Sequence, residues 1–184
     1  MWWINDLGFA ALMIFMAEFA DKTMLATVSL AITSRRVLAI ILISTFAFIL
    51  ANLIALATAL ILKYMISYEI LRVISSILFV SFGLVFIFKK GEHREMAYKG
   101  LWATLILVFT SELGDKTQLS LIAIALRSKC LIAVLFGSAL GYLTLNLLAV
   151  AFLSKIIKVE ASKAMKVIGA LFIVLGILVF FNII

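Results

Sequence analysis

The sequence contains no proline, one cysteine and one histidine, and each shortage excludes something. Without proline, any interruption of a helix must come from glycine or from a bulge. A lone cysteine, Cys130, excludes an internal disulfide and a cysteine-rich metal site. The histidine, His93, lies in a charged stretch, where it is expected to be solvated.

Charged residues are also scarce. They make up 14% of the 184 residues, whereas 66% are hydrophobic, and the mean hydropathy is +1.29. Soluble domains are closer to half apolar, so this chain has too little polar surface to cover a globular core and should face lipid. The net charge of +7 does not indicate nucleic acid as a partner, because no basic helix face and no alternation of basic and aromatic residues occurs.

Six apolar segments are each about as long as a membrane-spanning helix requires. Apolar and polar residues do not alternate in them, which excludes strands of a membrane barrel. We therefore predict an all-α membrane protein with six transmembrane helices, formed by residues 7–31, 38–62, 70–88, 101–126, 131–153 and 164–181.

Basic residues are divided unevenly between the two predicted membrane faces. The connections after the first, third and fifth segments, with the adjoining start of the last helix, hold ten Lys and Arg residues, and the opposite side holds four. Because cytoplasmic loops are enriched in these residues, the basic side is predicted to be cytoplasmic and both termini extracytoplasmic. The chain is thus expected to be a multi-pass protein of the plasma (inner) membrane.

The two halves of the sequence repeat at an offset of 94 residues. Because each half has three segments, an odd number, the second half enters the membrane from the opposite side. We predict two inverted three-helix repeats, residues 1–90 and 101–184, joined by a charged cytoplasmic loop at 91–100, an arrangement common among secondary transporters. The shift superposes Glu18 on Glu112, Asp21 on Asp115, Lys22 on Lys116, Thr23 on Thr117 and Asn52 on Asn146.

The repeated motif is Glu-x-x-Asp-Lys-Thr, near the middle of the first apolar segment of each half. A charge at that depth costs about 2.5–3.5 kcal/mol on insertion scales, so these side chains should face one another or a wet cavity. Residues three and four apart share a helix face, which predicts that Glu18, Asp21 and Lys22 line one face of a continuous helix. Packing of the halves about a two-fold axis then brings four carboxylates together.

Carboxylate oxygens are the ligands that Ca²⁺, Mg²⁺ and Mn²⁺ prefer. Neutral oxygens are available from Thr23, Thr117 and Gln118, with Asn52 and Asn146 as weaker candidates. Neither motif contains histidine or cysteine, which argues against zinc or copper. Four carboxylates against the two motif lysines leave a charge of −2, which one divalent cation or two protons neutralise.

Two other interpretations remain open at this point. The Glu18–Lys22 pair has the favourable order for an ion pair that fixes helix packing. Alternatively, the acids hold a metal for a membrane-embedded enzyme acting on a lipid phosphate, although no arginine cluster, glycine-rich phosphate loop or deep histidine accompanies them. Gly137 and Gly141 form a G-x-x-x-G pattern for close helix packing, within the chain or between copies in a homo-oligomer.

The paired motifs resemble the hallmark of the UPF0016/Gdt1 family of divalent cation:proton exchangers, and the resemblance covers essentially the whole chain. It implies exchange of Mn²⁺ or Ca²⁺ for protons, export in bacterial members, and no prosthetic group. It also implies that Glu18, Asp21, Glu112 and Asp115 are the ion ligands, with Lys22 and Lys116 as motif neighbours.

The first copy departs from the family pattern in two places. Ala20 replaces the motif glycine that the second copy keeps as Gly114, and an alanine is tolerated in a helix. Met24 stands where the second copy has Gln118. The first half thus loses an amide oxygen, and a thioether, if it touches the ion, favours Mn²⁺ over Ca²⁺ slightly.

Overall fold

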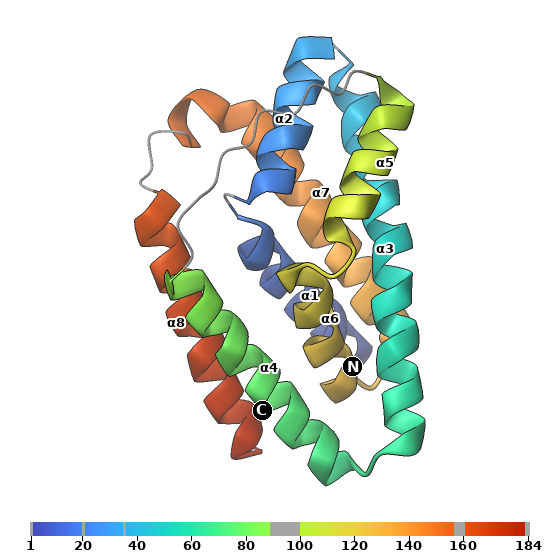
Figure 1. Cartoon of the computed structure of the whole chain (residues 1–184), viewed down its shortest axis with the longest axis vertical. Coiled ribbons are helices and arrows are strands. Elements are labelled where there is room, and N and C mark those ends of the chain that lie inside the picture. The colour runs from blue at the N-terminus through green and yellow to red at the C-terminus, as the bar shows by residue number, and fades with distance from the viewer. Residues whose placement is uncertain (1, 20, 35, 89–99, 157–160, 183–184) are drawn as a thin grey trace.

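The computed structural model describes residues 2–19, 21–34, 36–88, 100–156 and 161–182. Helices are the only regular structure in these ranges (Figure 1), which confirms the predicted all-α class. The predicted loop at 91–100, with His93, lies outside the described residues except for Gly100. The helices are α1 (Trp2–Glu18), α2 (Lys22–Ser34), α3 (Val37–Met65), α4 (Tyr68–Phe88), α5 (Leu101–Glu112), α6 (Lys116–Arg127), α7 (Leu131–Ile156) and α8 (Ala161–Phe180).

Two of the six predicted spans are not continuous helices. Segment 7–31 is divided between α1 and α2, and segment 101–126 between α5 and α6. Within the described ranges, the helices that have the length and apolar character to cross a membrane are Val37–Met65 and Leu131–Ala151. The prediction of six unbroken spanning helices was therefore wrong at the first and fourth segments. In both, the sequence stays largely apolar although one helix ends and another begins within the segment.

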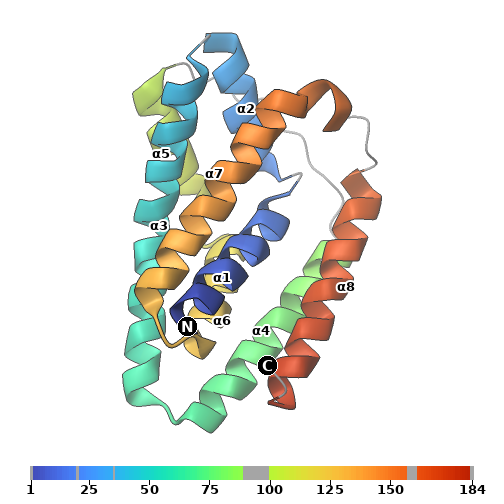
Figure 2. The same ribbon diagram turned by 180° about the vertical axis from the view of Figure 1, so that it is seen from behind.

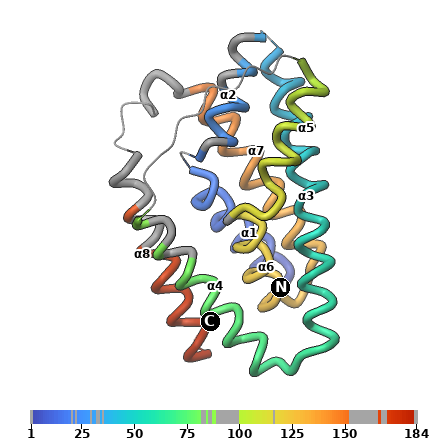
Figure 3. The backbone as a smooth tube through the Cα atoms, viewed as in Figure 1, coloured from blue at the N-terminus to red at the C-terminus, as the bar shows by residue number. Residues whose placement is uncertain are grey.

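Helix bounds in the second half follow those of the first. Helices α2 and α6 begin 94 residues apart, and so do α3 and α7, while α1 and α5 end 94 residues apart. Corresponding helices also run in opposite directions. In Figures 1 and 3, α1 rises from the N-terminus in the lower part of the molecule, whereas α5 descends from the top.

Helices from the two halves pack against each other rather than forming separate bundles. Helix α1 lies along α7, α4 lies along α8, and α3 contacts both α5 and α6. Figure 2 shows the α4–α8 pair beside the group that contains α1, α3 and α7. The buried core therefore belongs to both halves, with Ile14, Phe48 and Tyr142 among its largest fully buried side chains.

The outer surfaces of the long helices are apolar. On α3, Leu38 is 68% exposed and Leu42 is 61% exposed, and on α7 the values are 68% for Ile132 and 61% for Phe136. Contiguous apolar surface of this kind needs a partner, and for helices of this length lipid is the partner that fits.

The predicted G-x-x-x-G contact lies within the chain. A Cβ atom added to Gly137 would lie 2.2 Å from the carbonyl oxygen of Leu7, and one added to Gly141 would lie 2.2 Å from that of Ala11. Both glycines therefore allow the backbones of α7 and α1 to touch, as small residues do between membrane helices.

Gly141→Ala is expected to force α7 away from α1 and to lower the free energy of unfolding by about 1–3 kcal/mol, the usual cost of overpacking. Gly8→Ala is the matched control, because nothing lies within 4 Å of a Cβ added there. Thermal unfolding of the purified protein in detergent measures both. Equal midpoints for the two variants would show that the contact is not tight.

Candidate functional site

Both Glu-x-x-Asp-Lys-Thr motifs lie at the points where helices are interrupted. Helix α1 ends at Glu18 and α2 begins at Lys22, and α5 ends at Glu112 and α6 begins at Lys116. The predicted common helix face for Glu, Asp and Lys is therefore wrong, because the glutamate ends one helix and the lysine begins the next. In the second copy, Gly114 has φ +74°, a left-handed conformation that glycine adopts readily.

The interruptions place each aspartate just ahead of a helix. Asp115 is the N-cap residue of α6, and its carbonyl oxygen accepts the backbone N–H of Leu119 at 3.3 Å. The carbonyl oxygen of Asp21 accepts the N–H of Leu25 at 3.1 Å in the same way. A carboxylate at this position is stabilised by the partial positive charge of the helix N-terminus. Each interruption thus holds an acid at both of the helix ends that it creates.

The motif acids and threonines are buried. Glu18 is 0% exposed and Glu112 1%, and Asp21 is also buried, while Asp115 is half-buried with one buried carboxylate oxygen. The threonines of both motifs have no exposed surface. Lys22 and Lys116 begin their helices, but their side chains lie outside the described part of the structure, so their role as motif neighbours stays a prediction.

Each motif threonine meets the glutamate of the other motif. The hydroxyl of Thr117 donates a hydrogen bond to Oε1 of Glu18, which joins α6 to α1. The hydroxyl of Thr23 faces the carboxylate of Glu112 and lies 3.5 Å from the hydroxyl of Ser111. These crossed contacts bring the two motifs, 94 residues apart in the sequence, to one buried place.

The four acids interact through their charges without meeting at one point. The charges of Glu18, Asp115 and Asp21 all act on the carboxylate of Glu112. Both oxygens of Glu112 are buried and complete no hydrogen bond of ordinary geometry to the described residues. Among those residues, no group of three or more Asp, Glu, His and Cys side chains is arranged to hold a metal ion. The acids are thus gathered, but in this conformation they do not form a closed coordination shell.

Gln118, predicted as a source of a neutral oxygen, spans the second interruption. Its Oε1 accepts the backbone N–H of Gly114 at 2.7 Å, and its Nε2 donates to the carbonyl oxygen of Ala51 on α3 at 3.2 Å. The side chain thus connects the interrupted backbone to a long helix. A carbonyl oxygen has a second lone pair, so this position leaves one acceptor site on Oε1.

The two weaker candidates, Asn52 and Asn146, are fully buried in equivalent settings. Each Nδ2 donates to a carbonyl of its own helix, to Phe48 at 3.0 Å and to Tyr142 at 2.9 Å. Tyr142 was not among the residues predicted from the sequence. Its hydroxyl is buried, and the charges of Glu112 and Glu18 act on it. The sequence did contain a sign of this position, because Tyr142 and Phe48 are aromatic residues that lie 94 residues apart, at the offset of the repeat.

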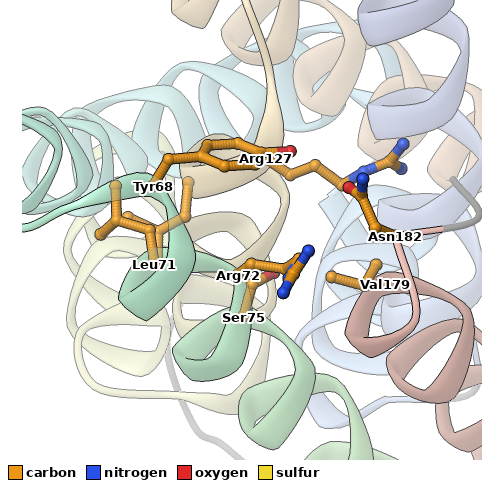
Figure 4. Close-up of a pocket in the computed structure, with 8 residues that line it drawn as sticks. Tyr68, Leu71, Arg72, Ser75, Arg127, Val179 and Asn182 are labelled. Carbon is orange, nitrogen blue, oxygen red and sulfur yellow. The ribbon is translucent and has the colours of Figure 1, made fainter.

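Two pockets near helix ends do not contain the motif acids. One, of about 370 Å³, has Asp6 on its wall, but the Asp6 carboxylate accepts the backbone N–H groups of Lys129 and Cys130, each at 2.9 Å. The other, of about 10 Å³, lies between α4, α6 and α8 (Figure 4), and Arg72 and Arg127 both line it. Basic walls and an engaged carboxylate make both pockets poor places for a cation.

Helices with apolar outer surfaces, around a buried centre of acids at paired helix interruptions, define an integral membrane protein with a polar core. The family model described as divalent cation/proton antiporter GDT1 matches residues 6–94 and again residues 100–183. These regions cover nearly the whole chain, and the protein belongs to this family. Searches of curated proteins and of solved structures found no match.

Family membership confirms the resemblance seen in the motifs. The family consists of membrane transporters that exchange divalent cations for protons, which supports cation transport by this chain and not an enzymatic activity. The alternative of a lipid phosphate hydrolase therefore has no support. The two matched regions begin 94 residues apart, the same offset at which the motifs recur.

Thr117→Val is expected to lower the free energy of unfolding by about 0.6–2 kcal/mol, the range for polar contacts between membrane helices, because Glu18 loses its donor from α6. Thr117→Ser keeps the hydroxyl and should restore most of that loss. Thermal unfolding in detergent distinguishes the two. A valine variant as stable as the serine variant would show that the Thr117–Glu18 contact contributes nothing.

Proposed function

We propose that this protein exports a divalent cation, Mn²⁺ in preference to Ca²⁺, from the cytoplasm in exchange for protons, with Glu18, Asp21, Glu112 and Asp115 as ligands of the transported ion. The observation that carries the proposal is the crossed contact between the motifs, in which Thr117 of one donates to Glu18 of the other. That contact joins α1 to α6, and the charges of Glu18, Asp115 and Asp21 act on Glu112, which supports a shared role for the four acids.

The donor chemistry supports a hard cation as the substrate. Carboxylate and hydroxyl oxygens predominate around the interruptions, and Mn²⁺ and Ca²⁺ both accept such ligands. Interrupted helices also leave backbone carbonyls near the break free to coordinate a cation, as in other secondary transporters. Glu112 fits the role of a ligand best, since its two buried oxygens complete no hydrogen bond to the described residues.

The preference for Mn²⁺ is proposed from the first motif. Met24 is 1% exposed and occupies the position equivalent to Gln118. Met24 packs with Val28, Leu145 and Ala149, so the first half offers no amide oxygen at this position. A site with one hard oxygen ligand fewer suits Mn²⁺ better than Ca²⁺.

Alternating access is proposed to follow from two inverted three-helix repeats, residues 1–90 and 101–184. The recurrence of helix bounds at an offset of 94 residues and the opposite directions of α1 and α5 support this arrangement. In such repeats the ion site lies near the bilayer midplane, where the repeats meet.

Coupling to protons is proposed to follow from charge. Four carboxylates and two lysines give the empty centre a charge of −2, and moving uncompensated charge through the bilayer is costly. One divalent cation or two protons restores neutrality, so the protein changes conformation with either load. Because both loads use the same oxygens, each must leave before the other binds.

Glu18→Gln, Asp21→Asn, Glu112→Gln and Asp115→Asn are each expected to lower the initial rate of Mn²⁺ transport in proteoliposomes by at least about 10- to 100-fold, the cost of losing even an outer-shell partner of a metal. Each change removes one charge and keeps the shape of the side chain. Glu69→Gln is the matched control, because Glu69 is exposed and pairs with Arg72 at 2.6 Å outside the site. Rates near wild type in all four variants would refute the ligand assignment.

An imposed pH gradient is expected to drive Mn²⁺ toward the more acidic compartment when ionophores clamp the membrane voltage. Metal affinity should fall as the pH decreases, by up to about tenfold per pH unit for each proton displaced, because protons occupy the same carboxylates. Flux of Mn²⁺ and of protons is measured in sealed proteoliposomes. Metal movement without proton counter-movement would indicate a channel or uniporter instead.

The uneven distribution of basic residues supports an inner-membrane orientation with both termini outside and the 91–100 loop in the cytoplasm. On a Cys130→Ala background, an impermeant thiol reagent applied to intact cells is expected to label Ile184→Cys and not His93→Cys. The opposite labelling pattern would reverse the orientation and with it the proposed direction of transport.

A further inference from the structure

The centre of the molecule holds two stacked aromatic rings from equivalent positions of the two halves. The rings of Phe48 on α3 and Tyr142 on α7 have centroids 4.3 Å apart and planes 18° from parallel. Both side chains are 0% exposed, and they come from α3 and α7, the helices in the described ranges that are long and apolar enough to cross a membrane. The halves therefore meet in a ring-to-ring contact whose two sides differ by one hydroxyl group.

That hydroxyl belongs to a small cluster beside the motif acids. It faces the hydroxyls of Thr27 on α2 and Ser44 on α3, and the charges of Glu112 and Glu18 act on it. Thr27, Ser44 and Tyr142 are all 0% exposed. Thr27 lies on α2, between the first interruption and the connection from α2 to α3, and Ser44 lies on α3 soon after that connection. The cluster therefore extends from the acids toward the end of the molecule where α2 meets α3.

The cluster is short of hydrogen-bond partners. The hydroxyl oxygens of Tyr142 and Thr27 are buried and complete no hydrogen bond of ordinary geometry with the described residues. Ser44 donates to the carbonyl of Ile41 at 2.9 Å, which leaves its own oxygen free to accept. Buried hydroxyls that face one another without completing a bond of ordinary geometry leave hydrogen-bonding capacity that a water or an ion can use, because an unmet polar group is costly in an apolar interior.

The equivalent positions of the other half, all of them described, do not form such a cluster. The position equivalent to Thr27 is Leu121, and the one equivalent to Tyr142 is Phe48, so two of the three hydroxyls are replaced by apolar groups. Only Ser44 has a polar counterpart, Ser138, and that hydroxyl donates to its own helix at 2.8 Å. Hydroxyl groups therefore lie beside the acids on the side of α2 and α3, whereas the equivalent positions of the other half hold the Phe48 ring and Leu121.

We infer that the hydroxyls of Thr27, Ser44 and Tyr142 hold water and form the passage for the hydrated divalent cation between the motif acids and the end of the molecule where α2 meets α3. The inference rests on the proposed function, since it needs the acids to bind that cation. Hydroxyl oxygens can accept hydrogen bonds from the waters of a hydrated cation or replace them one at a time. The stacked rings close the direct route between the halves.

Tyr142→Phe and Thr27→Val test the inference, because each removes one hydroxyl and keeps the size of the side chain. Initial rates of Mn²⁺ transport in proteoliposomes are compared with equilibrium Mn²⁺ binding to the purified protein in detergent. Each variant is expected to transport at least about fivefold more slowly, the effect of one hydrogen bond, with binding changed less than about twofold. Ser138→Ala, in the other half, is the matched control and should keep the wild-type rate.

Wild-type rates in both hydroxyl variants would overturn the inference, and so would a loss of Mn²⁺ binding as large as the loss of rate. The Glu112→Gln variant, assayed in parallel, separates the two proposals. If wild type and Glu112→Gln transport Mn²⁺ equally, the proposed function fails. If Glu112→Gln is inactive while Tyr142→Phe and Thr27→Val are normal, only the hydroxyl passage is wrong.

Discussion

Hydrocarbon does not satisfy the hydrogen bonds of an exposed peptide group, so an interrupted helix is tolerated at membrane depth only where protein surrounds it. This chain has two interruptions, at the ends of α1 and α5, and the arrangement of the other helices follows from covering them. The second interruption is bridged by Gln118, which accepts from Gly114 and donates to Ala51 on α3. Long, unbroken helices are needed around the broken ones, and α3 and α7 have this role.

The same enclosure keeps the motif acids buried at the centre of the molecule. A carboxylate next to lipid would be expelled toward the membrane surface, whereas one at an enclosed helix interruption stays buried with a donor close by. Thr117 supplies that donor for Glu18, and Thr23 faces Glu112. Since each threonine comes from the opposite motif, neither half can build the polar centre alone. The polar centre therefore requires both copies of the motif.

Sequence patterns predicted the helical class, the approximate extents of the unbroken helices and the apolar surroundings of the motif glutamates and threonines. They did not predict that the first and fourth segments are interrupted, because apolar residues flank both interruptions closely and no proline lies there. Gly114 was the one local signal in the second copy, and Ala20 replaces it in the first. The crossed contacts between threonine and glutamate were also beyond reach, since spacing along one helix says nothing about which side chains a second helix brings. The stacking of Phe48 on Tyr142 needed the fold as well, although their offset of 94 residues was visible.

The glycines of α7 determine which parts of the bundle can move together. At Gly137 and Gly141 the backbone of α7 touches the backbone of α1 directly. No flexible side chains separate the two helices at these positions. The contact therefore joins a helix of the first half directly to one of the second. The equivalent positions on α3 are Ile43 and Ala47, which carry side chains where α7 has glycine. Of the two helices that end in a motif glutamate, α1 with Glu18 is therefore held to its neighbour by a direct backbone contact, whereas α5 with Glu112 packs on a helix that has no glycine at the equivalent positions.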